Sequence, residues 1–137
     1  MKKFLERTAT TYGGRDGEIK DTQSGYSIKL AKPVEMGGKN PKGTNPEELF
    51  SIGYSACFSS SIEYLLQSDR IKYESISVQV VTALMMDEKT GFQFELTVTA
   101  KILGVTKDKE KEYIKKAYDF CPYSKAIRGN VLVTFVD

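Results

Sequence analysis

The sequence contains two cysteines, Cys57 and Cys121, and no histidine. The lack of histidine excludes Ser-His-Asp and Cys-His nucleophiles, His-ligated zinc and imidazole acid–base catalysis. Two cysteines alone cannot complete an all-thiolate zinc site. Any chemistry must therefore rest on cysteine, arginine, lysine, tyrosine or carboxylate side chains.

The two cysteines have several possible roles. Two thiols with none left over can form one intramolecular disulfide, and in a reducing compartment such a bond is more often transient and redox-active than structural. A purely structural disulfide is one alternative. Another is that Cys57 packs as an inert core residue, since free cysteine is among the most buried residue types. The spacing in the sequence does not decide between them.

A reactive cysteine would need a cation close to it. The thiolate is the reactive form, and burial on an apolar helix raises the pKa of a thiol. Without histidine, arginine is the best candidate, and Arg15 lies in a glycine-rich turn at residues 13–17 where its side chain can project. Arg15 could also be a plain solvated turn residue. Glu47 and Glu48 suit the start of a helix, and one of them could hold an arginine by a bidentate pair.

The segment from Asn45 to Gln67 is predicted to be the central helix. Asn45 is a good N-cap, Pro46 fits the first helical position, and residues 49–62 hold no charged side chain, which is typical of a buried helix. Glu47 and Cys57 are ten residues apart on it, roughly 15 Å of helical rise. Either the helix is irregular near Gly53, or a long arginine side chain bridges the two.

The remaining pattern predicts strands and one further helix. Thr106 can cap the second helix, and Pro122 is expected to end it just after Cys121. A loop is expected at 33–44. Strands joined as hairpins favour an α+β fold with antiparallel sheets packed around the central helix. The expected strands cover 5–12, 18–20, 26–30, 76–86, 92–103 and 131–136.

The composition is that of one ordinary domain over residues 1–137, with 40% hydrophobic and 28% charged residues. The net charge of +2 and the dispersed lysines do not support nucleic-acid binding. The basic start of the chain has no apolar segment after it, and no run is long enough to span a membrane. We therefore expect a cytoplasmic protein without a signal peptide or membrane insertion. Because one sheet covers only one side of the central helix, a second copy of the chain is expected to cover the other.

Four motifs in order resemble those of the organic hydroperoxide resistance (Ohr) proteins, within the OsmC/Ohr family of thiol peroxidases. The resemblance extends over essentially the whole chain, and the first and last motifs point to the Ohr branch. The motifs are Tyr-Gly-Gly-Arg-Asp-Gly at 12–17, Thr-Asn-Pro-Glu-Glu-Leu-Phe at 44–50, Gly-Tyr-Ser-Ala-Cys-Phe at 53–58, and Cys-Pro-Tyr-Ser-Lys-Ala-Ile-Arg-Gly-Asn at 121–130.

This resemblance implies a peroxidase that reduces organic hydroperoxides to alcohols. Cys57 would be the peroxidatic cysteine, which becomes a sulfenic acid, and Cys121 the resolving cysteine, which condenses with it to a disulfide. Arg15 would stabilise the thiolate and polarise the peroxide, and Glu47 would orient Arg15. An OsmC-type peroxidase with broader peroxide use and a non-catalytic ligand-binding protein are the alternatives.

The resemblance also implies the molecule's partners. Family members are intertwined homodimers whose disulfide is reduced by dihydrolipoyl groups on lipoylated proteins, and they need no metal or bound cofactor. An apolar pocket lined by Phe50, Tyr54 and Phe58 would favour bulky or lipid hydroperoxides over hydrogen peroxide.

Overall fold

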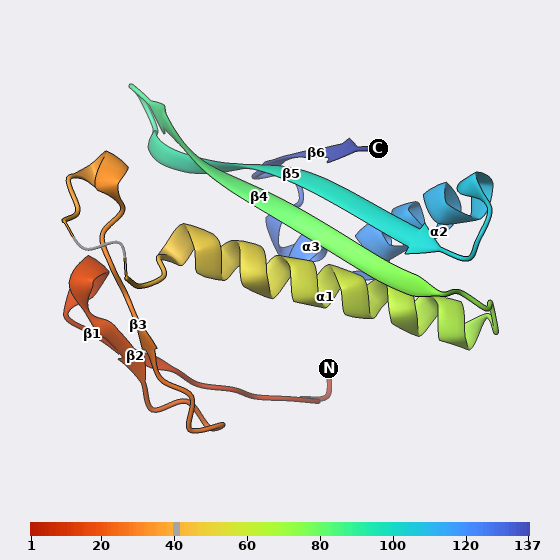
Figure 1. Ribbon diagram of the computed structural model, residues 1–137, viewed down its shortest axis with the longest axis horizontal. Coiled ribbons are helices and arrows are strands. Elements are labelled where there is room, and N and C mark those ends of the chain that lie inside the picture. Colours follow the sequence, from red (N-terminus) through yellow and green to blue (C-terminus); the bar gives the residue numbers. More distant parts are fainter. Residues whose placement is uncertain (40–41) are drawn as a thin grey trace. The chain divides into compact units, whose positions relative to one another are not determined.

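The computed structural model describes residues 1–39 and 42–137, which form two compact units, Met1–Leu49 and Phe50–Asp137 (Figure 1). Asn40 and Pro41, which belong to the loop expected at 33–44, lie outside the described residues. Within the described residues, no helix combines the length and apolar character that a membrane span requires. That the two units make up a single domain stays a prediction.

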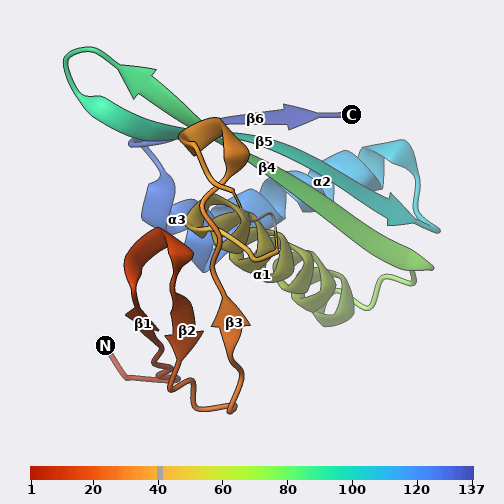
Figure 2. The same ribbon diagram turned by 60° about the vertical axis from the view of Figure 1, so that its left-hand side comes forward.

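The first unit contains a small antiparallel sheet. Its strands are β1 (Thr10–Tyr12), β2 (Glu18–Lys20) and β3 (Ile28–Lys29), which lie side by side in Figure 2. Short 3₁₀ turns, η1 (Gly14–Asp16) and η2 (Val34–Met36), follow β1 and β3. The strand expected from residue 5 begins only at residue 10, because the three residues of β2 pair with residues 10–12 alone.

Helix α1 (Pro46–Ser68) begins where the sequence predicts and ends one residue beyond the predicted Gln67. The side-chain oxygen of Asn45 accepts a hydrogen bond from the backbone N–H of Glu48 at 2.8 Å, which confirms the N-cap. The buried side chains recur every three or four residues, at 54, 58, 61, 62 and 66, so one face of the helix is buried. On other sides, Ile52 and Tyr64 keep 54% and 58% of their surface exposed.

The second unit has a mixed sheet with the order β4-β5-β6. Its strands are β4 (Ser75–Asp87), β5 (Gly91–Leu103) and β6 (Leu132–Val136). The first two form the expected antiparallel hairpin, but β6 runs parallel to β5. The chain passes through two helices before it re-enters the sheet, as a parallel crossover requires. The α+β class is therefore confirmed, while the all-antiparallel expectation is wrong for the last strand.

Two helices follow β5: α2 (Lys107–Phe120) and α3 (Pro122–Ile127). Thr106 caps α2 as predicted, since its hydroxyl accepts from the N–H of Lys109 at 3.3 Å. Pro122 ends α2, as predicted, and it also occupies the first position of α3, a helix that the sequence did not predict. Cys121 thus stands at the junction of two helices.

The core of the second unit lies between its sheet and its helices, which cover one face of that sheet (Figures 1 and 2). Alternate residues of β5 point inward, namely Leu96, Val98, Ala100 and Ile102. They meet buried side chains of α1 and α2 such as Ile62 and Ala117. Full burial of a large apolar side chain contributes about 1.5–3 kcal/mol, so this core holds α1, which bears Cys57, and α2, which leads to Cys121, against one sheet.

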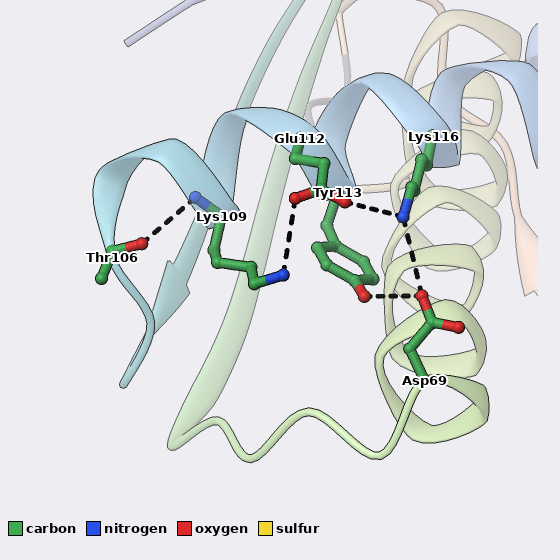
Figure 3. A network of polar contacts seen from close by, with 6 residues as sticks. All are labelled: Asp69, Thr106, Lys109, Glu112, Tyr113 and Lys116. Atoms are coloured by element: carbon green, nitrogen blue, oxygen red, sulfur yellow. Dashed lines mark hydrogen bonds and ion pairs between the residues drawn. The ribbon is translucent and has the colours of Figure 1, made fainter.

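A polar network joins the C-terminal end of α1 to α2 (Figure 3). The buried Tyr113 hydroxyl donates to Asp69 Oδ2 at 2.6 Å, and this hydrogen bond raises the pKa of Tyr113. The Lys116 ammonium lies 4.6 Å from the centre of the Tyr113 ring and 2.7 Å from Glu112 Oε1. The network therefore fixes the C-terminal end of α1 against the middle of α2.

Candidate active site

The turn that presents Arg15 depends on its glycines. Gly13 has a positive φ of 82°, which L side chains rarely adopt. A Cβ at Gly17 would collide with the carbonyl of Tyr12, and the Gly17 N–H closes the turn on the Gly14 carbonyl at 3.1 Å. The backbone is thus tightly folded around the arginine, as the sequence predicts.

Arg15 binds Glu47 through two parallel hydrogen bonds. Arg15 Nη1 lies 3.0 Å from Glu47 Oε2, and Nη2 lies 2.8 Å from Oε1. The arginine lowers the pKa of Glu47, and the carboxylate raises the pKa of Arg15, so both stay charged near neutral pH. The carboxylate of the adjacent Glu48 instead accepts from the Thr44 hydroxyl. Of the two glutamates, Glu47 is therefore the partner of Arg15.

In the second unit, the two cysteines are in direct contact. The Cys121 thiol donates to Cys57 Sγ, with the sulfurs 3.4 Å apart. A disulfide bond is about 2.05 Å long, so both are free thiols. Cys57 is half-buried on α1, and Cys121 is fully buried at the α2–α3 junction. The fold brings together two residues that the sequence pattern could not place in contact.

The surroundings of Cys57 within its unit favour the neutral thiol. Burial raises the pKa of Cys57, and the backbone N–H of Tyr123 offsets part of this rise by donating toward the sulfur. A protonated thiol is a poor nucleophile. Cys57 therefore needs a nearby cation to form a thiolate near neutral pH, as the sequence indicates.

The three predicted pocket residues belong to an aromatic cluster along α1. Tyr54 lies edge-on to Phe50 and to Phe58, with ring centres 6.2 and 6.0 Å away. Tyr54 and Phe58 have no exposed surface, whereas Phe50 is partly exposed. Phe50 also contacts Phe94 of β5 at 5.2 Å. Tyr54 and Phe58 thus pack as core residues, and their role in a substrate pocket stays a prediction.

Sequence reasoning missed the contacts between α1 and α3. The Tyr54 and Ser124 hydroxyls lie 2.9 Å apart, and the Tyr123 ring stacks on that of Tyr54. One signal was available: a mid-helix glycine costs about 1 kcal/mol relative to alanine, so Gly53 should have a packing reason. A Cβ there would lie 2.5 Å from the Tyr123 hydroxyl. The suggested irregularity near Gly53 is wrong, since α1 is continuous through it.

These groups define what the chain can do chemically. Two thiols in contact can give up two electrons and form one disulfide. The Arg15–Glu47 pair supplies an oriented guanidinium, a group that binds anions and polarises oxygen. Among the described residues, no three histidine, cysteine, aspartate or glutamate side chains gather as a metal site would require.

Comparison with known proteins identifies the family of the chain. A family model described as OsmC-like protein matches residues 37–136. The organic hydroperoxide resistance protein-like 2 of Staphylococcus epidermidis is 35% identical over 125 residues, which cover 90% of this chain and 88% of that protein. The organic hydroperoxide resistance protein OhrA of Bacillus subtilis is 34% identical over 128 residues, or 93% and 91% of the two chains.

Solved structures agree with these sequence matches. The crystal structure of an organic hydroperoxide resistance protein from Legionella pneumophila superposes with a TM-score of 0.92 at 36% identity, over 98% of this chain and 97% of that one. One from Elizabethkingia anophelis gives 0.92 at 38% identity, over 98% and 96%. The chain therefore belongs to the OsmC/Ohr family, among the organic hydroperoxide resistance proteins.

Proposed function

We propose that the protein is a two-cysteine peroxidase that reduces organic hydroperoxides to alcohols. Relatives that are about 35% identical over most of the chain are named for resistance to organic hydroperoxides, which supports a role in peroxide defence. The observation that supports a thiol mechanism most directly is the contact between Cys57 Sγ and Cys121 Sγ at 3.4 Å.

In the first step, the Cys57 thiolate attacks the distal oxygen of the hydroperoxide. A sulfur–oxygen bond forms, the oxygen–oxygen bond breaks, and the alkoxide takes a proton and leaves as the alcohol. Cys57 is then a sulfenic acid. We assign to Arg15 the stabilisation of the thiolate and the polarisation of the peroxide, and to Glu47 the orientation of Arg15 through its two hydrogen bonds.

In the second step, Cys121 attacks the sulfur of the Cys57 sulfenic acid. The sulfur–sulfur bond forms, the sulfur–oxygen bond breaks, and the hydroxyl leaves as water with the proton of the Cys121 thiol. The close approach of the two sulfurs supports this step, because little movement is needed to form the bond.

The cycle is completed by an external dithiol. Its two electrons reduce the Cys57–Cys121 disulfide, and a dihydrolipoyl group on a lipoylated protein is the reductant that we propose. We also propose that the protein works as a homodimer in the cytoplasm, without a bound metal or cofactor.

The test is turnover of an alkyl hydroperoxide with dihydrolipoamide, combined with mass spectrometry after one equivalent of hydroperoxide. The unsubstituted protein should lose two hydrogens as it forms the Cys57–Cys121 disulfide. Cys57→Ser should abolish turnover, while Cys121→Ser should react once and accumulate the sulfenic acid. Full activity in Cys57→Ser would refute the mechanism.

Two further measurements separate the competing functions. An OsmC-type peroxidase should use hydrogen peroxide about as fast as an alkyl hydroperoxide, whereas we expect a strong preference for the alkyl substrate. A non-catalytic binding protein should have a Cys57 thiol that reacts with peroxide no faster than a free thiol.

A further inference from the structure

A buried pair of hydroxyl groups lies between α1 and α3. Tyr54 Oη and Ser124 Oγ are 2.9 Å apart, and neither residue has any exposed surface. Burial raises the pKa of Tyr54, so the phenol keeps its proton throughout the neutral pH range. Since a buried polar group without a partner is costly, each hydroxyl constrains the position of the other.

The pair joins the two segments that hold the reactive sulfurs. Tyr54 stands three residues before Cys57 on α1, and Ser124 stands three residues after Cys121, in the short helix that Cys121 caps. Residues three apart on a helix lie on the same side of it. The hydroxyl contact therefore fixes the α1 turn that bears Cys57 against the α3 turn that begins at Cys121.

A second contact strengthens the same attachment. The Tyr123 ring stacks on the Tyr54 ring, with centres 6.0 Å apart and planes 13° apart. Its hydroxyl reaches so close to α1 that a Cβ at position 53 would lie 2.5 Å from it, so any larger residue there would displace the Tyr123 ring. α3 thus contacts α1 at Gly53 and Tyr54 in addition to the hydroxyl pair.

Disulfide formation makes a geometric demand on these segments. The sulfurs lie 3.4 Å apart, and the bond that forms between them is about 2.05 Å long. The Cys121 sulfur must approach along a narrow direction, and an error of 1 Å in the position of a reacting group can cost about 100-fold in rate. The attack by Cys57 on a peroxide forms no bond to Cys121, which only donates a hydrogen bond to the Cys57 sulfur. Loosening α3 should therefore affect the second step more than the first.

We propose that Tyr54 and Ser124 are positioning residues for the resolving step, in which their hydroxyl pair holds Cys121 in line for attack on the oxidised Cys57. This inference rests on the proposed function, since it concerns the second step of that cycle. Cys121 loses its proton, a sulfur–sulfur bond replaces the sulfur–oxygen bond of the Cys57 sulfenic acid, and one water leaves. Tyr54 and Ser124 gain and lose no atoms.

The experiment measures the two steps separately in the full chain. After one equivalent of an alkyl hydroperoxide, the loss of Cys57 thiol reports the first step, and the appearance of disulfide in acid-quenched samples reports the second. A 1,3-dione that captures sulfenic acid shows how long the intermediate lives. In Tyr54→Phe and in Ser124→Ala, we expect the ratio of the second rate to the first to fall about tenfold, with more sulfenic acid captured.

Two further variants distinguish positioning from simple loss of stability. Tyr118→Phe removes a phenol from the same unit that has no hydroxyl partner among the described residues, and it should leave the ratio unchanged. The double variant Tyr54→Phe/Ser124→Ala leaves no buried hydroxyl without a partner, so its stability should recover relative to Ser124→Ala. Its ratio of the second rate to the first should stay about tenfold below that of the unsubstituted protein. It should be no lower than in the single variants, because the two hydroxyls act as a unit.

The outcomes separate this inference from the function on which it rests. If the unsubstituted protein forms no disulfide after oxidation, the proposed function fails, and this inference fails with it. If that protein forms the disulfide and the substituted proteins keep its rate ratio, only the positioning role is refuted. Recovery of the rate ratio in the double variant, in step with its stability, would also refute it.

Discussion

The guanidinium of Arg15 is oriented by one carboxylate. Two parallel hydrogen bonds to Glu47 leave little rotational freedom, and the Glu47 side chain is only 15% exposed. A pair with this geometry is stronger and more directional than an exposed ion pair. Under the proposed mechanism, the guanidinium must present its free edge to sulfur and peroxide, so Glu47 matters through the direction that it gives Arg15.

Glu47→Gln should therefore slow the first step of the cycle. The amide has one acceptor oxygen and no charge, so the bidentate pair is lost. We expect a decrease of about tenfold or more in the single-turnover rate of Cys57 oxidation by an alkyl hydroperoxide. Glu48→Gln is the matched control, because Glu48 bonds to Thr44, and its rate should stay unchanged. Equal rates in the two variants would contradict the role given to Glu47.

Gly53→Ala tests the close approach of the Tyr123 hydroxyl, on α3, to the backbone of α1. The added methyl group would lie 2.5 Å from the Tyr123 hydroxyl, so the Tyr123 ring must move outward. Because alanine favours the helix by about 1 kcal/mol over glycine, urea unfolding should show little loss of stability. The peroxidase rate should nevertheless fall several-fold, since Tyr123 adjoins Cys57. An unchanged rate would show that the ring position is unimportant.

At the scale of elements, α2 is fixed to the sheet by a buried carboxylate. The N–H of Ile102 on β5 donates to Glu110 Oε2 at 2.8 Å, and Lys107 Nζ lies 2.8 Å from Oε1. The Ile102 N–H, and after it Lys107, lower the pKa of Glu110. Glu110 is only 7% exposed, and the two hydrogen bonds outweigh the effect of burial and favour the ionised carboxylate. Helix α2 leads directly to Cys121, and this contact anchors its first turn.

Stability should depend on pH through Glu110. A carboxyl group whose pKa is lower in the folded chain contributes stability above its ordinary pKa near 4.5, and this contribution is lost as the pH falls below that value. Glu110→Gln should cost about 1–2 kcal/mol in urea unfolding at pH 7, and the difference should shrink toward zero in acid. The exposed Glu112→Gln should have a much smaller effect. A difference that is constant with pH would contradict this account.

At the scale of the whole molecule, the second unit has surfaces that fit a partner. β4 is a 13-residue edge strand, with Val81 51% and Met86 66% exposed. Long edges of this kind are normally covered or blocked, because their free backbone groups can pair with another chain. On α1, Ile52 and Tyr64 are exposed apolar side chains beside a buried face. These features support the proposed homodimer.

Sedimentation should therefore give about twice the chain mass of 15.4 kDa at micromolar concentration. Ile52→Glu places a charge on the exposed side of α1, which is costly to bury, and should shift the equilibrium toward the monomer. The exposed substitution Lys89→Glu, in the β4–β5 turn, is the control and should leave the mass unchanged. A monomer at all concentrations would refute the dimer.

Local chemistry explains which elements the sequence could predict. Asn45 and Pro46 begin α1, and Thr106 caps α2. The alternation of apolar and polar residues indicates β4 and β5. Each of these signals depends only on residues close together in the sequence. The absence of histidine and the presence of two thiols likewise limited the chemistry without any structure. The OsmC/Ohr family could be recognised from motifs of this local kind.

Contacts between distant segments decided the rest. Three features join residues far apart in the chain: the 3.4 Å contact between Cys57 and Cys121, the paired hydrogen bonds between Arg15 and Glu47, and the parallel direction of β6. So does the Tyr54–Ser124 pair. Residue types and spacing constrain the backbone nearby, but the packing of α1, α2 and α3 on one sheet determines which side chains meet. The sequence alone determined which groups could react, and only the tertiary structure placed the two thiols in contact.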